Sequence, residues 1–225
     1  MTEEVKKKGD PTALGIFAYG FSLFALSIYA TGFFSFSTES IVMIAPALFF
    51  GGLFLLIASI WEYNNGNTFG ATAFATYSGF FLVFAFAHIG IKLGWFAPLI
   101  VAHLVGIMAF AFIIMTFIYW IGSFKMNLVL NLTLFFLLIV FILYAIPLLT
   151  LTASNTTAFG TFPATALAPA GWVGILDSIL TMWIGAAVII NDRWEVAGSH
   201  GPIPLFPFGK KGEKTASKTP AGQHH

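Results

Sequence analysis

Long uncharged runs alternate with short polar segments along the chain, and this pattern predicts six membrane-spanning helices. A helix needs about 20 mostly apolar residues to cross the hydrocarbon core of a bilayer. The expected spans cover residues 12–34, 40–62, 68–92, 98–124, 127–150 and 171–190. They form one membrane domain over residues 10–195, between a solvated leader at residues 1–9 and a disordered tail at residues 196–225. The expected fold class is therefore an all-α membrane protein.

Local signals refine the ends of these spans. Asp10 suits the N-cap of the first helix, and Pro11 suits its first helical position, where a missing N–H is tolerated. The glycine pair Gly51-Gly52 predicts a close helix crossing in the second span. Residues 152–170 are rich in Thr, Ala, Gly and Pro, so we expect a long loop before the last span.

A tight helical hairpin is expected where the second span meets the third. Asn64, Asn65 and Gly66 tolerate left-handed backbone and suit a helix C-cap. Asn67 or Thr68 can then accept hydrogen bonds from the free amides of the next helix. Amides left open at this helix start would form a weak anion site.

Composition excludes a soluble protein. The chain has 225 residues, of which 58% are hydrophobic and 8% charged, and its mean hydropathy is +0.90. Cysteine is absent, which excludes disulfides and thiolate metal sites. The sequence contains neither a GxSxG motif nor a glycine-rich phosphate loop, so an enzyme, an ATPase or a nucleic-acid partner has no support.

The basic residues predict the orientation. With both termini in the cytoplasm, nine of the ten Lys and Arg residues face the cytoplasm, and Lys92 alone faces outward. We therefore expect a multi-pass protein of the plasma or inner membrane, with the hairpin at Glu62 on the cytoplasmic side.

Few ionisable residues lie inside the predicted spans. Asp177 falls in the first turns of the last span, where the helix dipole favours a carboxylate, so it is expected to be a helix-start acid. His88 and His103 lie on neighbouring antiparallel spans, which leaves a bis-histidine haem protein as an alternative. A third ligand is missing from the pattern, and we expect neither a metal nor a cofactor.

A stripe of hydroxyl and amide side chains follows the apolar spans. Each of these side chains could simply bond a neighbouring helix. Their number against so few charges favours a narrow path for a small, weakly held solute. The residues are Tyr19, Ser22, Thr72, Thr76, Tyr77, Asn127, Asn131, Thr133 and Thr181, with His88 near the outer end of the same path.

Several motifs resemble those of the acetate uptake transporter family, also called succinate-acetate permeases. The hairpin sequence EYNNGNTFGATAF, which begins at Glu62 and contains Gly66 and Gly70, resembles the family's EYKKGNTFGATAF block. Asp10-Pro11-Thr12-Ala13-Leu14-Gly15 resembles its NPAPLGL signature, Phe49-Phe50-Gly51-Gly52 its FYGG element, and Ala170-Gly171-Trp172-Val173-Gly174 its AGW-G element. This chain differs from the family motifs at three places: Asp10 stands where the family has Asn, Ala13 where it has Pro, and Asn64-Asn65 where it has a pair of lysines. These changes could weaken anion attraction.

The resemblance implies a channel or transporter for acetate and related short-chain carboxylates, including succinate, with passive or proton-coupled flux. It also implies a homohexamer of six-span subunits with a path through each one. The constriction of that path would consist of Tyr19, Tyr77 and Leu137, with the two phenol hydroxyls meeting the carboxylate. Residues expected along the path are Asn67, Thr68, Thr72, Thr76, Ser22, Asn131, Thr133, Thr181 and His88. A non-transporting membrane sensor is the remaining alternative.

Overall fold

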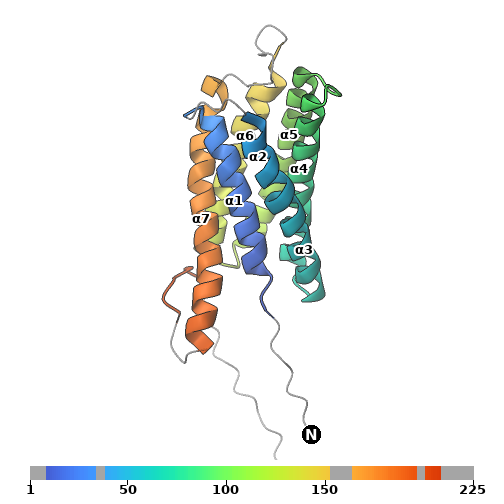
Figure 1. The fold of residues 1–225 in the computed structure, drawn as a ribbon. Coiled ribbons are helices and arrows are strands. Elements are labelled where there is room, and N and C mark those ends of the chain that lie inside the picture. Colours follow the sequence, from blue (N-terminus) through green and yellow to red (C-terminus); the bar gives the residue numbers. More distant parts are fainter. Residues whose placement is uncertain (1–8, 34–38, 153–163, 197–200, 209–225) are drawn as a thin grey trace, which may run out of the picture.

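Six helical spans build the molecule (Figure 1). The structure is a computed structural model that describes residues 9–33, 39–152, 164–196 and 201–208. Secondary structure in these ranges is helical, apart from one isolated bridge between Asn127 and Pro207. The elements are α1 (Thr12–Thr31), α2 (Glu39–Pro46), the π-helix η1 (Ala47–Phe54), α3 (Leu55–Asn64), α4 (Thr68–Lys92), α5 (Pro98–Ser123), α6 (Leu128–Leu149) and α7 (Ala164–Val196). Six segments are long and apolar enough to cross a membrane, which confirms the predicted all-α membrane fold.

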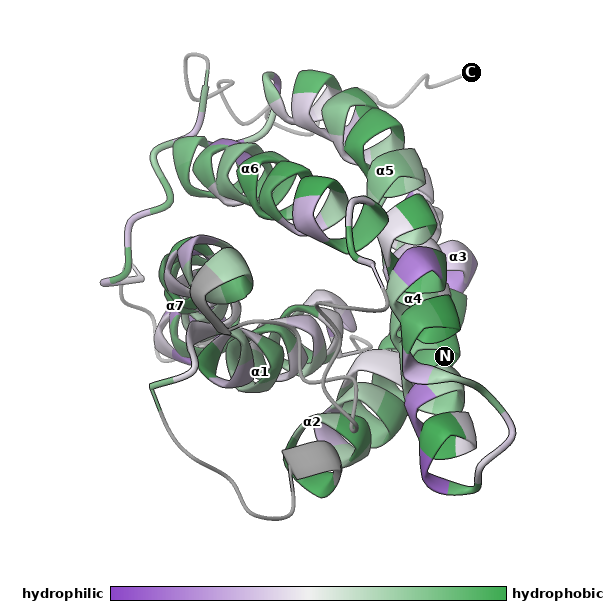
Figure 2. Cartoon of the chain, turned by 90° about the horizontal axis from the view of Figure 1, so that it is seen from above, coloured by the Kyte–Doolittle hydropathy of each residue, from purple (hydrophilic) through white to green (hydrophobic). Residues whose placement is uncertain are grey.

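The helices surround a common interior, as the view along the bundle in Figure 2 shows. α7 packs against α1 and α6, α5 packs against α6, and α3 with η1 packs against α4. In the described part of the chain, the backbone of α6 stays apart from α1 and α4, so side chains fill the space between these three helices. We call the end at which α1 begins and α7 finishes the lower end, and the opposite end the upper end (Figure 1).

The second span is interrupted by a π-helix that the sequence did not reveal. η1 begins directly after Pro46. Wider π turns leave carbonyl groups without their usual partners. Ser22 Oγ on α1 donates to the Pro46 carbonyl at 2.9 Å, and Ser78 Oγ on α4 donates to the Gly52 carbonyl at 2.8 Å. Gly52 also packs directly against Leu82, which confirms the predicted close crossing.

Small residues bring α1 and α7 close together. A Cβ atom on Gly171 would lie 2.6 Å from the Thr31 nitrogen and 2.7 Å from the Ser27 carbonyl oxygen. A side chain cannot be added there without separating the two helices. This contact fixes the height of α7 relative to α1.

Both predicted ends of the last span are wrong. α7 already begins at Ala164, so residues 164–170 of the expected loop are helical, and Pro169 lies inside the helix. Residues 153–163 of that loop lie outside the described residues. The helix also continues beyond residue 190 to Val196. The polar residues 191–193, which were expected to end the helix, form part of it beyond its apolar segment.

The tail prediction is wrong for residues 201–208, which we call the strap. Asn191 exchanges two hydrogen bonds with the Ile203 backbone, and Trp183 Nε1 donates to the Pro204 carbonyl at 3.1 Å. The Leu128 amide donates to the Phe206 carbonyl at 2.9 Å. These bonds hold the strap across the lower end between α6 and α7. The leader at residues 1–8 and the tail at residues 209–225 lie outside the described residues.

Candidate transport path

Two cavities inside the bundle share three of their lining side chains. The lower cavity has a volume of about 180 Å³ and the upper cavity about 30 Å³. Both are lined by Tyr19 on α1, Tyr77 on α4 and Leu137 on α6, which we call the throat. A cavity needs about 10–15 Å³ of volume for each buried water, so the upper cavity has room for only two or three waters. The interior is therefore much narrower above the throat than below it.

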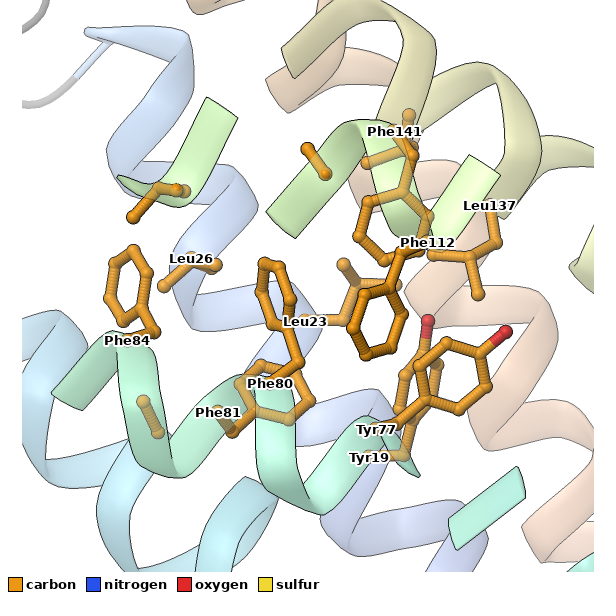
Figure 3. Close-up of a cluster of buried hydrophobic side chains, with 14 of the residues drawn as sticks. Tyr19, Leu23, Leu26, Tyr77, Phe80, Phe81, Phe84, Phe112, Leu137 and Phe141 are labelled. Carbon is orange, nitrogen blue, oxygen red and sulfur yellow. The ribbon is translucent and has the colours of Figure 1, made fainter. Parts of the chain in front are cut away.

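The throat side chains point inward, away from lipid. Tyr19, Tyr77 and Leu137 are 7%, 5% and 2% exposed. The two phenol rings lie 5.4 Å apart between centroids, and Figure 3 shows Leu137 beside them. Contact between side chains from three helices, rather than a backbone constriction, thus separates the two cavities.

The two throat hydroxyls differ in their bonding. Tyr77 shares a hydrogen bond of 3.0 Å with Thr116 Oγ1 on α5. The hydroxyl of Tyr19 is buried and has no partner among the described residues. Both hydroxyls were expected to meet the carboxylate; in this conformation that of Tyr77 is shared with Thr116, whereas that of Tyr19 has no partner among the described residues.

Above the throat lies a collar of phenylalanines that was not predicted from the sequence (Figure 3). Phe80 packs against Phe112 and Phe141 with ring centroids 5.1 and 5.5 Å apart, and Phe81 lies 6.0 Å from Tyr19. The positions of Tyr77, Phe80 and Phe81 on α4 follow helical spacing, which could have indicated that they share one face. The collar makes the upper part of the interior apolar.

A buried carboxylate organises the lower mouth. Glu62 is 2% exposed and accepts hydrogen bonds from Thr12 Oγ1 and from Asn67 Nδ2, the latter at 2.7 Å. The Asn67 side chain also accepts a hydrogen bond of 3.0 Å from the Gly70 amide, which confirms Asn67 as the N-cap of α4. This cap occupies the Gly70 amide, one of the amides at the start of α4 that were expected to be open to an anion.

The first motif packs against the hairpin. Asp10 Oδ1 accepts a hydrogen bond of 2.9 Å from the Thr12 amide. The first helix starts one residue later than predicted, so Pro11 rather than Asp10 holds the N-cap position. Gly15 contacts the ring of Phe74 so closely that a side chain would not fit there. A third cavity of about 460 Å³ at the lower end is lined by Gly9, Asp10, Pro11, Leu14, Trp61, Asn64 and Asn65. The hairpin turn itself depends on Gly66, whose φ of 76° favours glycine.

Three of the residues expected along the path line the lower cavity. They are Asn67, Thr133 and Thr181. The hydroxyls of Thr133 and Thr181 are buried and have no partner among the described residues. With the Tyr19 hydroxyl, they give the lower cavity three hydrogen-bond donors that are available to a ligand.

Other expected path residues serve contacts between helices. Ser22 bonds to the Pro46 carbonyl, and Asn131 donates to Ser123 Oγ at 2.8 Å. Thr76 bonds to its own helix and to the Tyr119 hydroxyl at 3.1 Å. Thr68 and Thr72 are exposed, because α4 turns Ala73, Phe74 and Tyr77 inward instead. None of these five expected residues lines the lower or upper cavity.

The two histidines are bonded to backbone carbonyls. His88 Nδ1 lies 2.8 Å from the Phe84 oxygen, and His103 Nε2 lies 3.0 Å from the Leu151 oxygen. One ring nitrogen of each histidine is thereby engaged by a backbone oxygen, in His88 from its own helix and in His103 from just beyond the end of α6. This arrangement does not favour the haem alternative, and His88 lies beside the path rather than lining either cavity.

Comparison with known proteins places the chain among membrane transporters. The sequence pattern of the GPR1/FUN34/yaaH family matches residues 1–200. The chain is 28% identical over 189 residues to the succinate-acetate/proton symporter SatP of Escherichia coli K12, covering 84% of this chain and 92% of the relative. It is 43% identical over 82 residues to acetate permease A of Emericella nidulans, covering 36% and 27%.

A solved structure agrees with the fold. The structure of the bacterial acetate channel SatP superposes with a TM-score of 0.74 at 26% identity, covering 88% of this chain and 99% of the other. The strap lies just beyond residue 200, where the family match ends.

Proposed function

The chain belongs to the GPR1/FUN34/yaaH family, and on this premise we propose that it carries acetate and related short-chain carboxylates, including succinate, across the membrane. The observation that carries this proposal is the throat formed by Tyr19, Tyr77 and Leu137, which lines both the lower and the upper cavity. A transport path needs no catalytic group or cofactor. The proposed role is therefore recognition and passage rather than chemistry.

The lower cavity suits a carboxylate. Carboxyl groups have pKa values of about 4 and are ionised at neutral pH, and an unpaired ion in an apolar interior is very costly. The hydroxyls of Tyr19, Thr133 and Thr181 can donate hydrogen bonds that replace part of the lost hydration. Without a cation among the lining residues, the ion is held weakly and can leave again.

The throat suits the hydrocarbon part of a small acid. Leu137 and the ring of Tyr77 present apolar surface next to the Tyr19 hydroxyl, so both halves of acetate find a matching neighbour. The upper cavity holds only two or three waters, which makes this conformation a narrow one. Passage therefore requires the collar side chains to change rotamer, and larger solutes are rejected by size.

Assembly and orientation are part of the same proposal. We infer a homohexamer in the plasma or inner membrane, with a separate path in each subunit and both termini in the cytoplasm, as expected from the resemblance and the lysine distribution. Large apolar side chains are exposed along α5, among them Ile107, Phe110, Ile114 and Ile118. Lipid or a neighbouring subunit would cover them.

Reconstitution tests the function. Purified protein in liposomes should take up labelled acetate faster than protein-free liposomes, with unlabelled acetate competing. Absence of flux from folded protein would favour the non-transporting sensor instead. The absorption spectrum of the same sample tests the haem alternative, which requires a Soret band.

A further inference from the structure

Asp177 is a buried acid that the proposed path does not yet use. It lies thirteen residues after the start of α7, about 20 Å along the helix axis, so its prediction as a helix-start acid is wrong. The side chain is 0% exposed, and neither carboxylate oxygen has a hydrogen-bond partner among the described residues. An ionised carboxylate in such a place is very unfavourable unless something compensates it.

Its position on α7 places Asp177 beside the throat. Thr181, one turn further along the same helix, lines the lower cavity. A Cβ atom on Gly174, nearly one turn before it, would lie 3.8 Å from Val140, which lines the upper cavity. Asp177 is therefore level with the junction of the two cavities.

The described side chains that line the two cavities provide no counter-charge for Asp177. The ionisable ones among them are the phenols Tyr19 on α1, Tyr77 on α4 and Tyr144 on α6. On α6, the neighbouring positions at the throat are Leu137 and Val140, which cannot ionise. Ser27 on α1 and Thr181 on α7 carry further hydroxyls without partners among the described residues, and both can bond to a neutral acid.

Resting on the proposed function, we propose that Asp177 binds the proton that accompanies the carboxylate through the throat. An ionised Asp177 and a carboxylate ion repel each other strongly across this weakly polar interior. A protonated Asp177 removes the repulsion, so proton and anion favour each other's presence, and this linkage is reciprocal. One proton and one anion then cross together with no net charge.

The proton balance of the cycle is simple. A hydronium ion on the entry side gives its proton to one Asp177 oxygen and leaves a water, while the carboxylate occupies the lower cavity. After the anion has passed the throat, Asp177 returns the proton to water on the exit side. No covalent bond to the substrate forms, and no electron transfer is involved.

Electrical measurements in proteoliposomes test this assignment. Potassium and valinomycin set the membrane potential at equal pH on both sides, and the initial rate of labelled acetate uptake is corrected with protein-free liposomes. The variants are Asp177→Asn, which stays neutral and carries no proton, and Asp177→Glu, which keeps the acid. Ser178→Ala is the matched control, because Ser178 is also 0% exposed and, within the described part of the chain, its hydroxyl donates to the Ile175 carbonyl of its own helix.

Wild type, Asp177→Glu and Ser178→Ala should transport acetate at rates independent of the potential. Asp177→Asn should carry the acetate anion without a proton. An inside-positive potential of 59 mV should then raise its initial rate of acetate uptake severalfold, because this potential corresponds to a tenfold equilibrium concentration ratio for one charge. Wild-type flux that follows the potential would overturn the proposal, whether or not the variants fold. So would potential-independent flux, or no flux, in folded Asp177→Asn. Absence of wild-type flux above protein-free liposomes would instead overturn the proposed function itself.

Discussion

The rings of Tyr19 and Tyr77 meet with centroids 5.4 Å apart and planes tilted by 51°, at the level where the lower and upper cavities join. They come from α1 and α4, and their hydroxyls have different surroundings. Tyr77 is bonded to Thr116, whereas Tyr19 has no partner among the described residues. This asymmetry separates a structural hydroxyl from one that is available to the substrate.

Removal of each hydroxyl should therefore have a different effect. Tyr19→Phe should weaken acetate binding about fivefold, since a net hydrogen bond contributes about 1 kcal/mol, and it should leave thermal stability unchanged. Tyr77→Phe leaves Thr116 Oγ1 buried without a partner and should lower stability by about 1–3 kcal/mol with little change in acetate affinity. The measurements are the concentration dependence of uptake and thermal unfolding in detergent. The opposite assignment of the two effects would contradict the geometry.

Widening the throat should change which acids pass. The double variant Tyr77→Ala with Leu137→Ala removes two of its three side chains, so the ratio of succinate to acetate uptake should rise severalfold. Leu148→Ala is a suitable control, because Leu148 is also buried on α6 but packs against Gly106 of α5 instead of lining the throat. Each Leu→Ala change costs about 2–5 kcal/mol of stability. Both variants therefore lose stability, but only the double variant widens the throat. An unchanged ratio in folded double variant would place the narrow point elsewhere.

The buried Glu62 should matter for stability more than for passage. Glu62→Gln loses a charged acceptor for Thr12 and Asn67 and should lower the free energy of unfolding by about 1–3 kcal/mol. Glu195→Gln, at an exposed position near the end of α7, should leave stability within about 0.5 kcal/mol. Thermal unfolding of both variants measures the difference. Equal unfolding temperatures would mean that the carboxylate network does not hold the hairpin.

The sequence predicted the spans well because hydrophobic length and helix ends are local properties. The range of α4 and the capping role of Asn67 follow directly from local chemistry. The ends of α7 do not follow from local chemistry. A helix can extend past its apolar segment into the membrane interface, where water forms hydrogen bonds with its polar residues. Asp177 was misjudged for this reason alone, since its depth depends on where α7 begins.

The candidate site was predictable only in part. The resemblance supplied Tyr19, Tyr77 and Leu137, and all three lie together in the interior. A polar residue on an apolar helix can face a path or a neighbouring helix, and the sequence does not distinguish these cases for Ser22 or Asn131. The strap was missed because its own residues form these hydrogen bonds through their backbone groups, which leave no pattern in the sequence of residues 201–208.

The strap should restrict access to the lower cavity. Leu205 lines that cavity, and Asn191 anchors the strap through Ile203. Asn191→Ala should increase amide exchange of residues 201–208 and raise the acetate uptake rate. Arg193→Gln is the control, since Arg193 is exposed and, among the described residues, its ion pair is with the adjacent Asp192 rather than with the strap. Faster exchange without faster uptake would mean that the strap does not limit entry.

Whether acetate passes through the throat can be tested most directly with a single cysteine, since the chain contains none. Leu137→Cys in proteoliposomes should lose acetate uptake after reaction with a small charged methanethiosulfonate reagent, and acetate should slow that reaction. Leu148→Cys, treated in the same way, should keep its uptake. Unchanged uptake by Leu137→Cys protein that mass spectrometry finds fully labelled would contradict a path between Tyr19, Tyr77 and Leu137.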